Sequence, residues 1–166
     1  MSNSIDTVKA YFASLGRTEE ILEFSVSSAT VELAAQALSV EPAMIAKTLS
    51  FESGDGCLLL VAAGDARVDN VKFRGEFGFK ARMLSPDRVE ALTGHTPGGV
   101  CPFALPQGVR VFTDISLLRF PAVYPACGSD HSAVRLTCDN LFTLSGSLKW
   151  VDVCKGWPAE PLASDP

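Results

Sequence analysis

Cys57-Leu58-Leu59-Leu60-Val61-Ala62-Ala63 is an uninterrupted apolar run near the middle of the chain. A short apolar run with turn residues on both sides is typical of a strand that is buried on both faces of a sheet. Ser53-Gly54-Asp55-Gly56 precedes the run and predicts a hairpin turn. Residues 47–51 alternate in polarity, as the partner strand of such a hairpin would. These residues predict a β-hairpin whose second strand lies at the centre of a sheet.

Helices and strands are mixed along the rest of the chain without strict alternation. Three polar residues that can cap helices, Thr30, Asp69 and Asp139, each precede a segment that we expect to be helical. Further helices are expected over 6–15 and 86–92, and further strands over 109–113, 122–127, 133–137 and 149–153. This mixture predicts a single α+β or α/β domain built around a mixed β-sheet. We expect this domain to span residues 1–157 and residues 158–166 to form a loose tail.

The chain has 166 residues, an ordinary globular composition and a formal net charge of −5. Because no apolar run is long enough for a transmembrane helix and the first residues do not resemble a signal peptide, we expect a cytoplasmic protein. The negative charge repels nucleic acid, so any contact with nucleic acid would need a local basic patch or a partner. Five cysteines without a C-x-x-C pair predict free thiols.

A stretch from Gly94 to Pro106 contains three glycines and three prolines within thirteen positions. This density disfavours a long helix or a regular strand, because proline lacks the N–H and glycine loses more entropy on ordering. Gly98 and Gly99 remove side-chain bulk, so the loop can present N–H groups as a cradle for an anion or a carbonyl oxygen. An ordinary surface turn is the alternative interpretation.

The two histidines, His95 and His131, lie close in sequence to Cys101 and Cys127. Together these residues could form a zinc site, but their spacings match no common zinc motif. Cys101 and His95 could instead form a nucleophilic pair if the N–H groups of the loop lowered the pKa of the thiol. In a third interpretation, Cys101 is a small side chain packed in the core.

Basic residues provide the remaining candidates. Lys47 stands at the head of a predicted strand, either as a solvated edge residue or as a cation aimed into a pocket. Four basic residues within eleven positions form either a solvated helix face or a phosphate-binding patch: Lys72, Arg74, Lys80 and Arg82.

Four stretches resemble the YbaK/prolyl-tRNA synthetase editing-domain family in sequence, order and spacing. They are residues 30–35 (TVELAA), 45–51 (IAKTLSF), 94–102 (GHTPGGVCP) and 124–129 (YPACGS). The resemblance extends over about residues 5–155. Its most specific parts are the lysine of the I-x-K-[ST]-L stretch, here Lys47, and the G-x-x-x-P loop, here Gly98 to Pro102.

The resemblance implies hydrolysis of mischarged aminoacyl-tRNA, usually tRNA for proline that carries alanine, cysteine, serine or threonine. It implies an α+β fold with a mixed, mostly antiparallel β-sheet flanked by helices. It also implies a free-standing, trans-acting deacylase without a metal or a cofactor, with prolyl-tRNA synthetase as a possible partner. The residues that it places in catalysis are Lys47, Gly98, Gly99, Val100, Cys101 and Pro102. The residues that it places in substrate binding are Thr30, Thr48, Gly128, Ser129, Asp130 and His131, and the basic patch at 72–82 would contact the tRNA.

Two alternatives to a deacylase stay open at this point. The first is a binding module on the same fold that holds tRNA or an aminoacyl-nucleotide without turnover. The second is a thiol- or metal-dependent hydrolase built on the two histidines and on Cys101 and Cys127.

Overall fold

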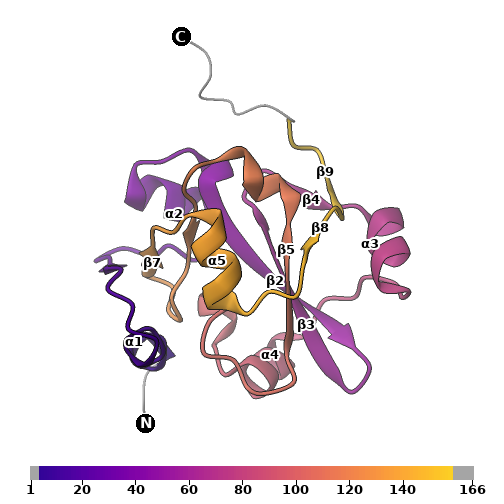
Figure 1. Ribbon diagram of the computed structural model, residues 1–166, viewed down its shortest axis with the longest axis horizontal. Coiled ribbons are helices and arrows are strands. Elements are labelled where there is room, and N and C mark those ends of the chain that lie inside the picture. The colour runs from indigo at the N-terminus through magenta and orange to yellow at the C-terminus, as the bar shows by residue number, and fades with distance from the viewer. Residues whose placement is uncertain (1–3, 159–166) are drawn as a thin grey trace.

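A long β-hairpin forms the centre of the structure, a computed structural model that describes residues 4–158 (Figure 1). Strands β2 (Ile45–Ser53) and β3 (Gly56–Ala63) pair antiparallel from Ala46 and Ala63 to Ser53 and Gly56. The hairpin predicted from the apolar run is therefore confirmed. The tail expected at 158–166 lies, apart from Pro158, outside the described residues.

The main sheet has five strands in the order β6-β2-β3-β5-β8. Strands β6 (Tyr124–Pro125), β5 (Arg110–Asp114) and β8 (Trp150–Val151) add through short parallel pairings. Two small antiparallel pairs lie outside it: β1 (Ile21–Glu23) with β7 (Ser132–Val134), and β4 (Arg67–Val68) with β9 (Cys154–Lys155). The mixed, mostly antiparallel α+β architecture is thus confirmed, because most of the paired residues are antiparallel.

Five α-helices and three short 3-10 helices surround the sheet within the described residues. The α-helices are α1 (Ser4–Ser14), α2 (Val31–Leu38), α3 (Asn70–Phe77), α4 (Pro86–Thr93) and α5 (Cys138–Ser145). The 3-10 helices are η1 (Pro42–Met44), η2 (Pro97–Gly99) and η3 (Ile115–Arg119). None of the helices in residues 4–158 has both the length and the apolar character that crossing a membrane requires.

Two of the three predicted helix caps are confirmed, and the third is a different residue. Thr30 accepts a hydrogen bond from the Leu33 N–H at the start of α2, and Asp69 caps α3. The cap of α5 is Thr137 and not Asp139, because the Thr137 hydroxyl accepts the Asn140 N–H at 3.1 Å. Asp139 instead occupies the first turn, where a negative charge interacts favourably with the helix dipole.

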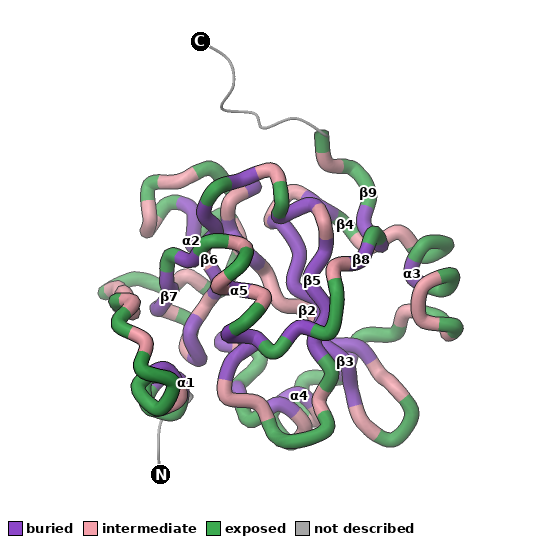
Figure 2. The backbone as a smooth tube through the Cα atoms, in the orientation of Figure 1, coloured by how far each residue is buried: buried purple, intermediate pink, exposed green. Residues whose placement is uncertain are grey.

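Strand β3 is buried along nearly its whole length, and Figure 2 accordingly colours most of it purple. All residues from Leu58 to Ala63 have no solvent exposure, since β2 and β5 flank the strand and helices and loops cover both faces. The strand expected over 122–127 is shorter than predicted, and only Tyr124 and Pro125 pair with β2. Proline has no N–H to donate to a ladder, which limits the extent of β6.

Candidate functional site

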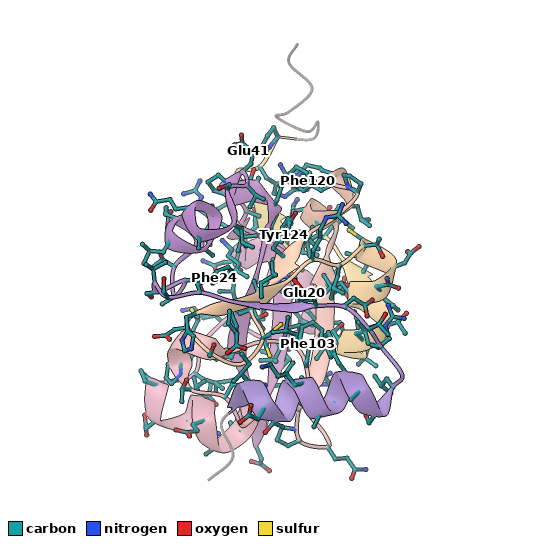
Figure 3. The ribbon with its side chains drawn as sticks, turned by 90° about the vertical axis from the view of Figure 1, so that its left-hand side faces the viewer. Glu20, Phe24, Glu41, Phe103, Phe120 and Tyr124 are labelled. Atoms are coloured by element: carbon teal, nitrogen blue, oxygen red, sulfur yellow. The ribbon has the colours of Figure 1, made fainter. Side chains whose placement is uncertain are left out.

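A cavity of about 260 Å³ opens beside the uncovered edge of β2. Strand β6 pairs only with Ile45 and Ala46, so residues 47–49 border the cavity instead of another strand. The other walls come from residues 28–34, from the loop at 97–100 and from the region of β6 and β7. Figure 3 views the molecule from the side on which α2 lies. Tyr124, which lines the cavity, lies near α2 in this view, and Phe24 lies below α2.

Lys47 lines the cavity, but its ammonium group is not free. The Lys47 Nζ donates to the carbonyl oxygens of Gly64, at 3.4 Å, and of Ala66. Partial burial lowers the pKa of the Lys47 ammonium below its usual value, while the charges of Asp65 and Glu32 partly oppose this shift. The structure therefore places Lys47 in the wall of the site, with its charge held by the backbone at the end of β3.

The turn that holds Lys47 is itself fixed by two contacts. The Arg119 guanidinium pairs with Asp65 through both carboxylate oxygens, and its side chain is only 3% exposed. Gly64 packs against η1 so closely that an added Cβ would lie 2.0 Å from the Pro42 carbonyl oxygen. The two acceptors of Lys47 therefore belong to a turn that is anchored at Gly64 and at Asp65.

The glycine-rich loop divides into residues that line the cavity and residues that support them. Gly98 and Val100 line the cavity, and the lining surface of Gly98 is backbone because glycine has no side chain. Gly99 is buried and its N–H donates to the Thr96 carbonyl oxygen at 2.9 Å. Pro102 lies at a separate cavity. Of the five loop residues expected in catalysis, two therefore face the site.

Gly99 allows two loops of the protein to pack closely against each other. A Cβ on Gly99 would lie 2.8 Å from the Ser129 Cα and 2.9 Å from the Gly128 carbonyl carbon. Such distances are shorter than real Cβ contacts, so the packing of these loops requires glycine at this position. The interpretation in which Gly99 clears space for a ligand is wrong, whereas Gly98 has only one neighbour, the Asp130 Cβ, at 3.5 Å from an added Cβ.

Cys101 is a packed side chain and not a nucleophile in the cavity. Its side chain is fully buried, and burial raises the pKa of the Cys101 thiol to about 12. The His95 Nε2 lies 3.5 Å from the Cys101 Sγ but 2.8 Å from the Phe103 carbonyl oxygen. Since a carbonyl can only accept, Nε2 carries the proton and cannot remove one from the thiol.

The zinc interpretation is also wrong. Within residues 4–158, no group of three or more histidine, cysteine or acidic side chains has a geometry that could hold a metal ion. His95 and Cys101 are buried together, whereas His131 is nearly half exposed and lies 2.9 Å from the Asp130 carboxylate. The two histidines thus have different environments and different partners.

The loop at 128–131 lies behind the cavity wall and does not line the cavity. Gly128 and Ser129 pack behind Gly99, and the Ser129 hydroxyl donates to the Ser132 hydroxyl at 2.8 Å. Asp130 and His131 form an exposed pair beside Gly98. None of the four residues from 128 to 131 lines the cavity, although Ser132 and Ala133 do.

Thr30 and Thr48 both line the cavity, as expected for substrate-binding residues. Thr30 is already occupied as the cap of α2, since its Oγ1 lies 3.1 Å from the Leu33 nitrogen. Ser28, Tyr124 and Ser132 add further polar groups to the lining of this cavity, and no sequence pattern predicted them as site residues. Ser28 stands in a serine-rich segment before a helix, and that local pattern indicates only a cap.

The predicted phosphate-binding patch lies away from the cavity. Figure 1 shows α3 on the opposite side of the molecule from α2, which forms part of the cavity wall. The Lys72 Nζ pairs with the Asp152 carboxylate at 3.0 Å, while Arg74 and Lys80 border a shallow surface depression. The role of this patch, including Arg82, stays a prediction.

This arrangement of sheet, cavity and glycine-rich loop defines a known class of α+β domain. A solved structure of a candidate trans-editing enzyme for prolyl tRNA synthetase superposes with a TM-score of 0.85 at 30% identity, over 94% of this chain and 99% of that one. The model of the aminoacyl-tRNA editing domain matches residues 26–144. The chain therefore belongs to the aminoacyl-tRNA editing domain family.

Relatives within the family are of two kinds. The uncharacterized protein YwhH of Bacillus subtilis (strain 168) is 52% identical over 155 residues, which is 93% of this chain and 99% of that protein. A proline--tRNA ligase of Moorella thermoacetica (strain ATCC 39073 / JCM 9320) is 31% identical over 81 residues, which is 48% of this chain but only 14% of the ligase. The chain thus matches YwhH along nearly the whole length of both proteins. It matches the ligase over about half of its own length and over a small part of the ligase.

Proposed function

We propose that this protein is a trans-acting deacylase that hydrolyses the ester of mischarged aminoacyl-tRNA. Its preferred substrate would be tRNA for proline that carries a small non-cognate amino acid. The observation that carries the proposal is the cavity itself, which both Lys47 and the backbone of Gly98 line, in a chain of the editing domain family. Similarity to part of a proline--tRNA ligase supports proline tRNA as the substrate.

The reaction needs a water molecule to add to the ester carbonyl carbon. The carbon–oxygen bond to the ribose then breaks, the ribose oxygen takes a proton, and the amino acid leaves as a carboxylate. Negative charge develops on the carbonyl oxygen in the transition state, and fixed N–H donors stabilise such charge. Gly98 and Val100 would supply these donors, because the Gly99 N–H is already used within η2.

The cavity supplies little acid–base chemistry of its own. Lys47 is the only charged residue among the described residues that line it, and neither a carboxylate nor an imidazole does so. We infer that a hydroxyl of the terminal ribose helps to activate the water, so that the protein acts mainly by positioning and by electrostatics. Lys47 would hold the terminal nucleotide or its phosphate as a point charge.

Binding of the tRNA body would need help from elsewhere. With a net charge of −5, the protein as a whole repels a polyanion. We propose that prolyl-tRNA synthetase hands over the tRNA or shares in its recognition. The basic residues at 72–82 remain candidates for contact with the tRNA body, and such a substrate would place the protein in the cytoplasm.

A non-catalytic binding module is the second candidate function. The observation that favours it is the lack of a carboxylate or imidazole among the described residues of the cavity wall. A binding module would protect the aminoacyl ester from hydrolysis, whereas a deacylase would release the amino acid.

The decisive experiment is a deacylation panel. Proline tRNA is charged in vitro with labelled alanine, cysteine, serine, threonine or proline, and release of the label is followed under single-turnover conditions. We expect release of at least one small amino acid well above the uncatalysed rate and little release of proline. Stoichiometric protection of every ester would contradict the deacylase and support the binding module.

Replacing Cys101 with alanine is expected to leave most of the deacylase activity, within about threefold of wild type. The thiol is buried, and burial raises its pKa to about 12, which disfavours the nucleophilic thiolate near neutral pH. The measurement is single-turnover deacylation, with melting curves to report any loss of packing. Complete inactivation of a variant that still melts as wild type does would instead indicate a cysteine nucleophile.

A further inference from the structure

Two hydroxyl groups at the cavity have no hydrogen-bond partner. Within residues 4–158, the Ser28 Oγ and the Thr48 Oγ1 are the buried side-chain polar atoms that lack one. Both residues line the same cavity. A buried hydroxyl without a partner costs free energy, so such groups in native proteins usually indicate a ligand, a bound water or a strained site.

The two residues come from different walls. Thr48 lies on β2 opposite Val61 of β3, next to Lys47. Ser28 lies in the segment before α2, and its N–H donates to the Asp130 carbonyl oxygen, which fixes the backbone there. Both unpartnered oxygens are shielded from solvent. A rotation about χ1 between staggered positions is the movement by which each hydroxyl would turn toward a bound group.

The surroundings of these hydroxyls restrict what can bind to them. Val31, Ala34 and Ile45 provide an apolar wall in the same cavity, and the only charged lining residue is Lys47. A charged phosphate would suit Lys47 and the glycine backbone, whereas a neutral group with both a hydroxyl and a carbon surface would suit the remaining walls. The side chains of serine and threonine have these properties, while alanine offers no hydrogen bond and a thiol offers a weak one.

We propose that Ser28 and Thr48 recognise the side-chain hydroxyl of serine or threonine esterified to tRNA, so that the protein removes these amino acids in preference to alanine. This inference rests on the proposed deacylase function and names its substrate class. A site that hydrogen-bonds a substrate hydroxyl discriminates strongly against the analogue without it, because the site is then left with unpaired polar groups. The side-chain hydroxyl itself does not react, and the ester is cleaved by water as described above.

The test compares rates on one tRNA body. Proline tRNA is charged with serine, threonine or alanine, and single-turnover deacylation is measured for wild type and variants. We expect wild type to release serine and threonine at least about tenfold faster than alanine. Thr48→Val removes the hydroxyl at nearly constant shape, and we expect it to lower the ratio of the serine rate to the alanine rate about tenfold. Ser28→Ala should lower the ratio in the same direction.

Two control variants test whether the change in preference comes from the hydroxyl at position 48. Thr48→Ser keeps the hydroxyl and should keep the preference. Thr143→Val removes a hydroxyl from an exposed position on α5 and should leave the ratio unchanged. Equal wild-type rates for serine and alanine would overturn the inference while leaving the deacylase function intact. An equal loss on all substrates in Thr48→Val would also overturn it, because the hydroxyl would then contact the tRNA end that all substrates share.

Failure of the deacylase function gives a different result, namely no release of any amino acid. In that case, binding of adenosine with an amide-linked seryl or alanyl group at the 3′ position is measured by calorimetry. Tighter binding of the seryl compound, lost in Thr48→Val, would support recognition of the hydroxyl without turnover. Equal affinity for the two compounds would overturn it.

Discussion

Replacing Lys47 with alanine is expected to lower the single-turnover deacylation rate about 30- to 5,000-fold. This range corresponds to about 2–5 kcal/mol of transition-state stabilisation, as expected for a charge used in a water-poor site. Lys47 is the only charged residue among the described residues that line the cavity, so no neighbour in the wall can replace it. Lys47→Arg should also lose most of the activity, because the planar guanidinium does not fit where the ammonium meets the carbonyl oxygens of Gly64 and Ala66.

The structure changes what we expect of the stability of these variants. A solvated lysine would contribute little, but the Lys47 ammonium satisfies carbonyl oxygens of a half-buried turn in which Ala66 is fully buried. Its removal should therefore lower the free energy of unfolding by about 1–3 kcal/mol. Lys47→Met, which retains the apolar stem, helps to separate the loss of charge from the loss of packing.

The matched control is Lys149→Ala, an exposed lysine that pairs with Glu76 outside the cavity. Its rate should stay within about twofold of wild type, since exposed ion pairs contribute little. Deacylation rates and melting curves are measured together for all four variants. Wild-type rates in Lys47→Ala would remove the main support for a catalytic role of this residue.

Replacing Gly99 with valine is expected to damage both folding and activity. The new Cβ would lie 2.8 Å from the Ser129 Cα and 2.9 Å from the Gly128 carbonyl carbon, so one of two backbones must move. Overpacking of this kind costs about 1–3 kcal/mol, which corresponds to a fall in Tm of about 2–12 °C for a domain of this size. Because Gly98 and Val100 flank Gly99 and line the cavity, we also expect deacylation to fall more than about tenfold.

Gly98→Ala is the matched control for stability. Its added Cβ would make only an ordinary contact of 3.5 Å with the Asp130 Cβ, so its Tm should stay close to that of wild type. The measurements are melting curves and single-turnover rates for both variants. A Gly99→Val protein with an unchanged Tm but no activity would contradict the packing of the two loops and would favour close approach of the substrate to Gly99.

Much of the fold was predictable because its signals are local in the sequence. The apolar run at 57–63 and the turn before it specify the hairpin, and Thr30 specifies the start of α2. The cap of α5 was assigned to the wrong residue because Thr137 and Asp139 both have capping side chains within the same turn. The strand at 122–127 was overestimated because its pairing depends on β2, which lies far away in the chain.

The candidate site was predictable only in part. Five of the expected residues do line one cavity, although their roles stay predictions: Thr30, Lys47, Thr48, Gly98 and Val100. The sequence by itself determined the hairpin and the helix caps, because each depends on residues close together in the chain. It also determined the family resemblance, which depends on the order and spacing of four short stretches. Only the tertiary structure decided that Lys47 binds the turn at 64–66, that Gly99 packs against Gly128 and Ser129, and that Ser28 shares a cavity with Thr48. These contacts join residues 17 or more positions apart in the chain, and the packing of separate elements sets their distances and burial.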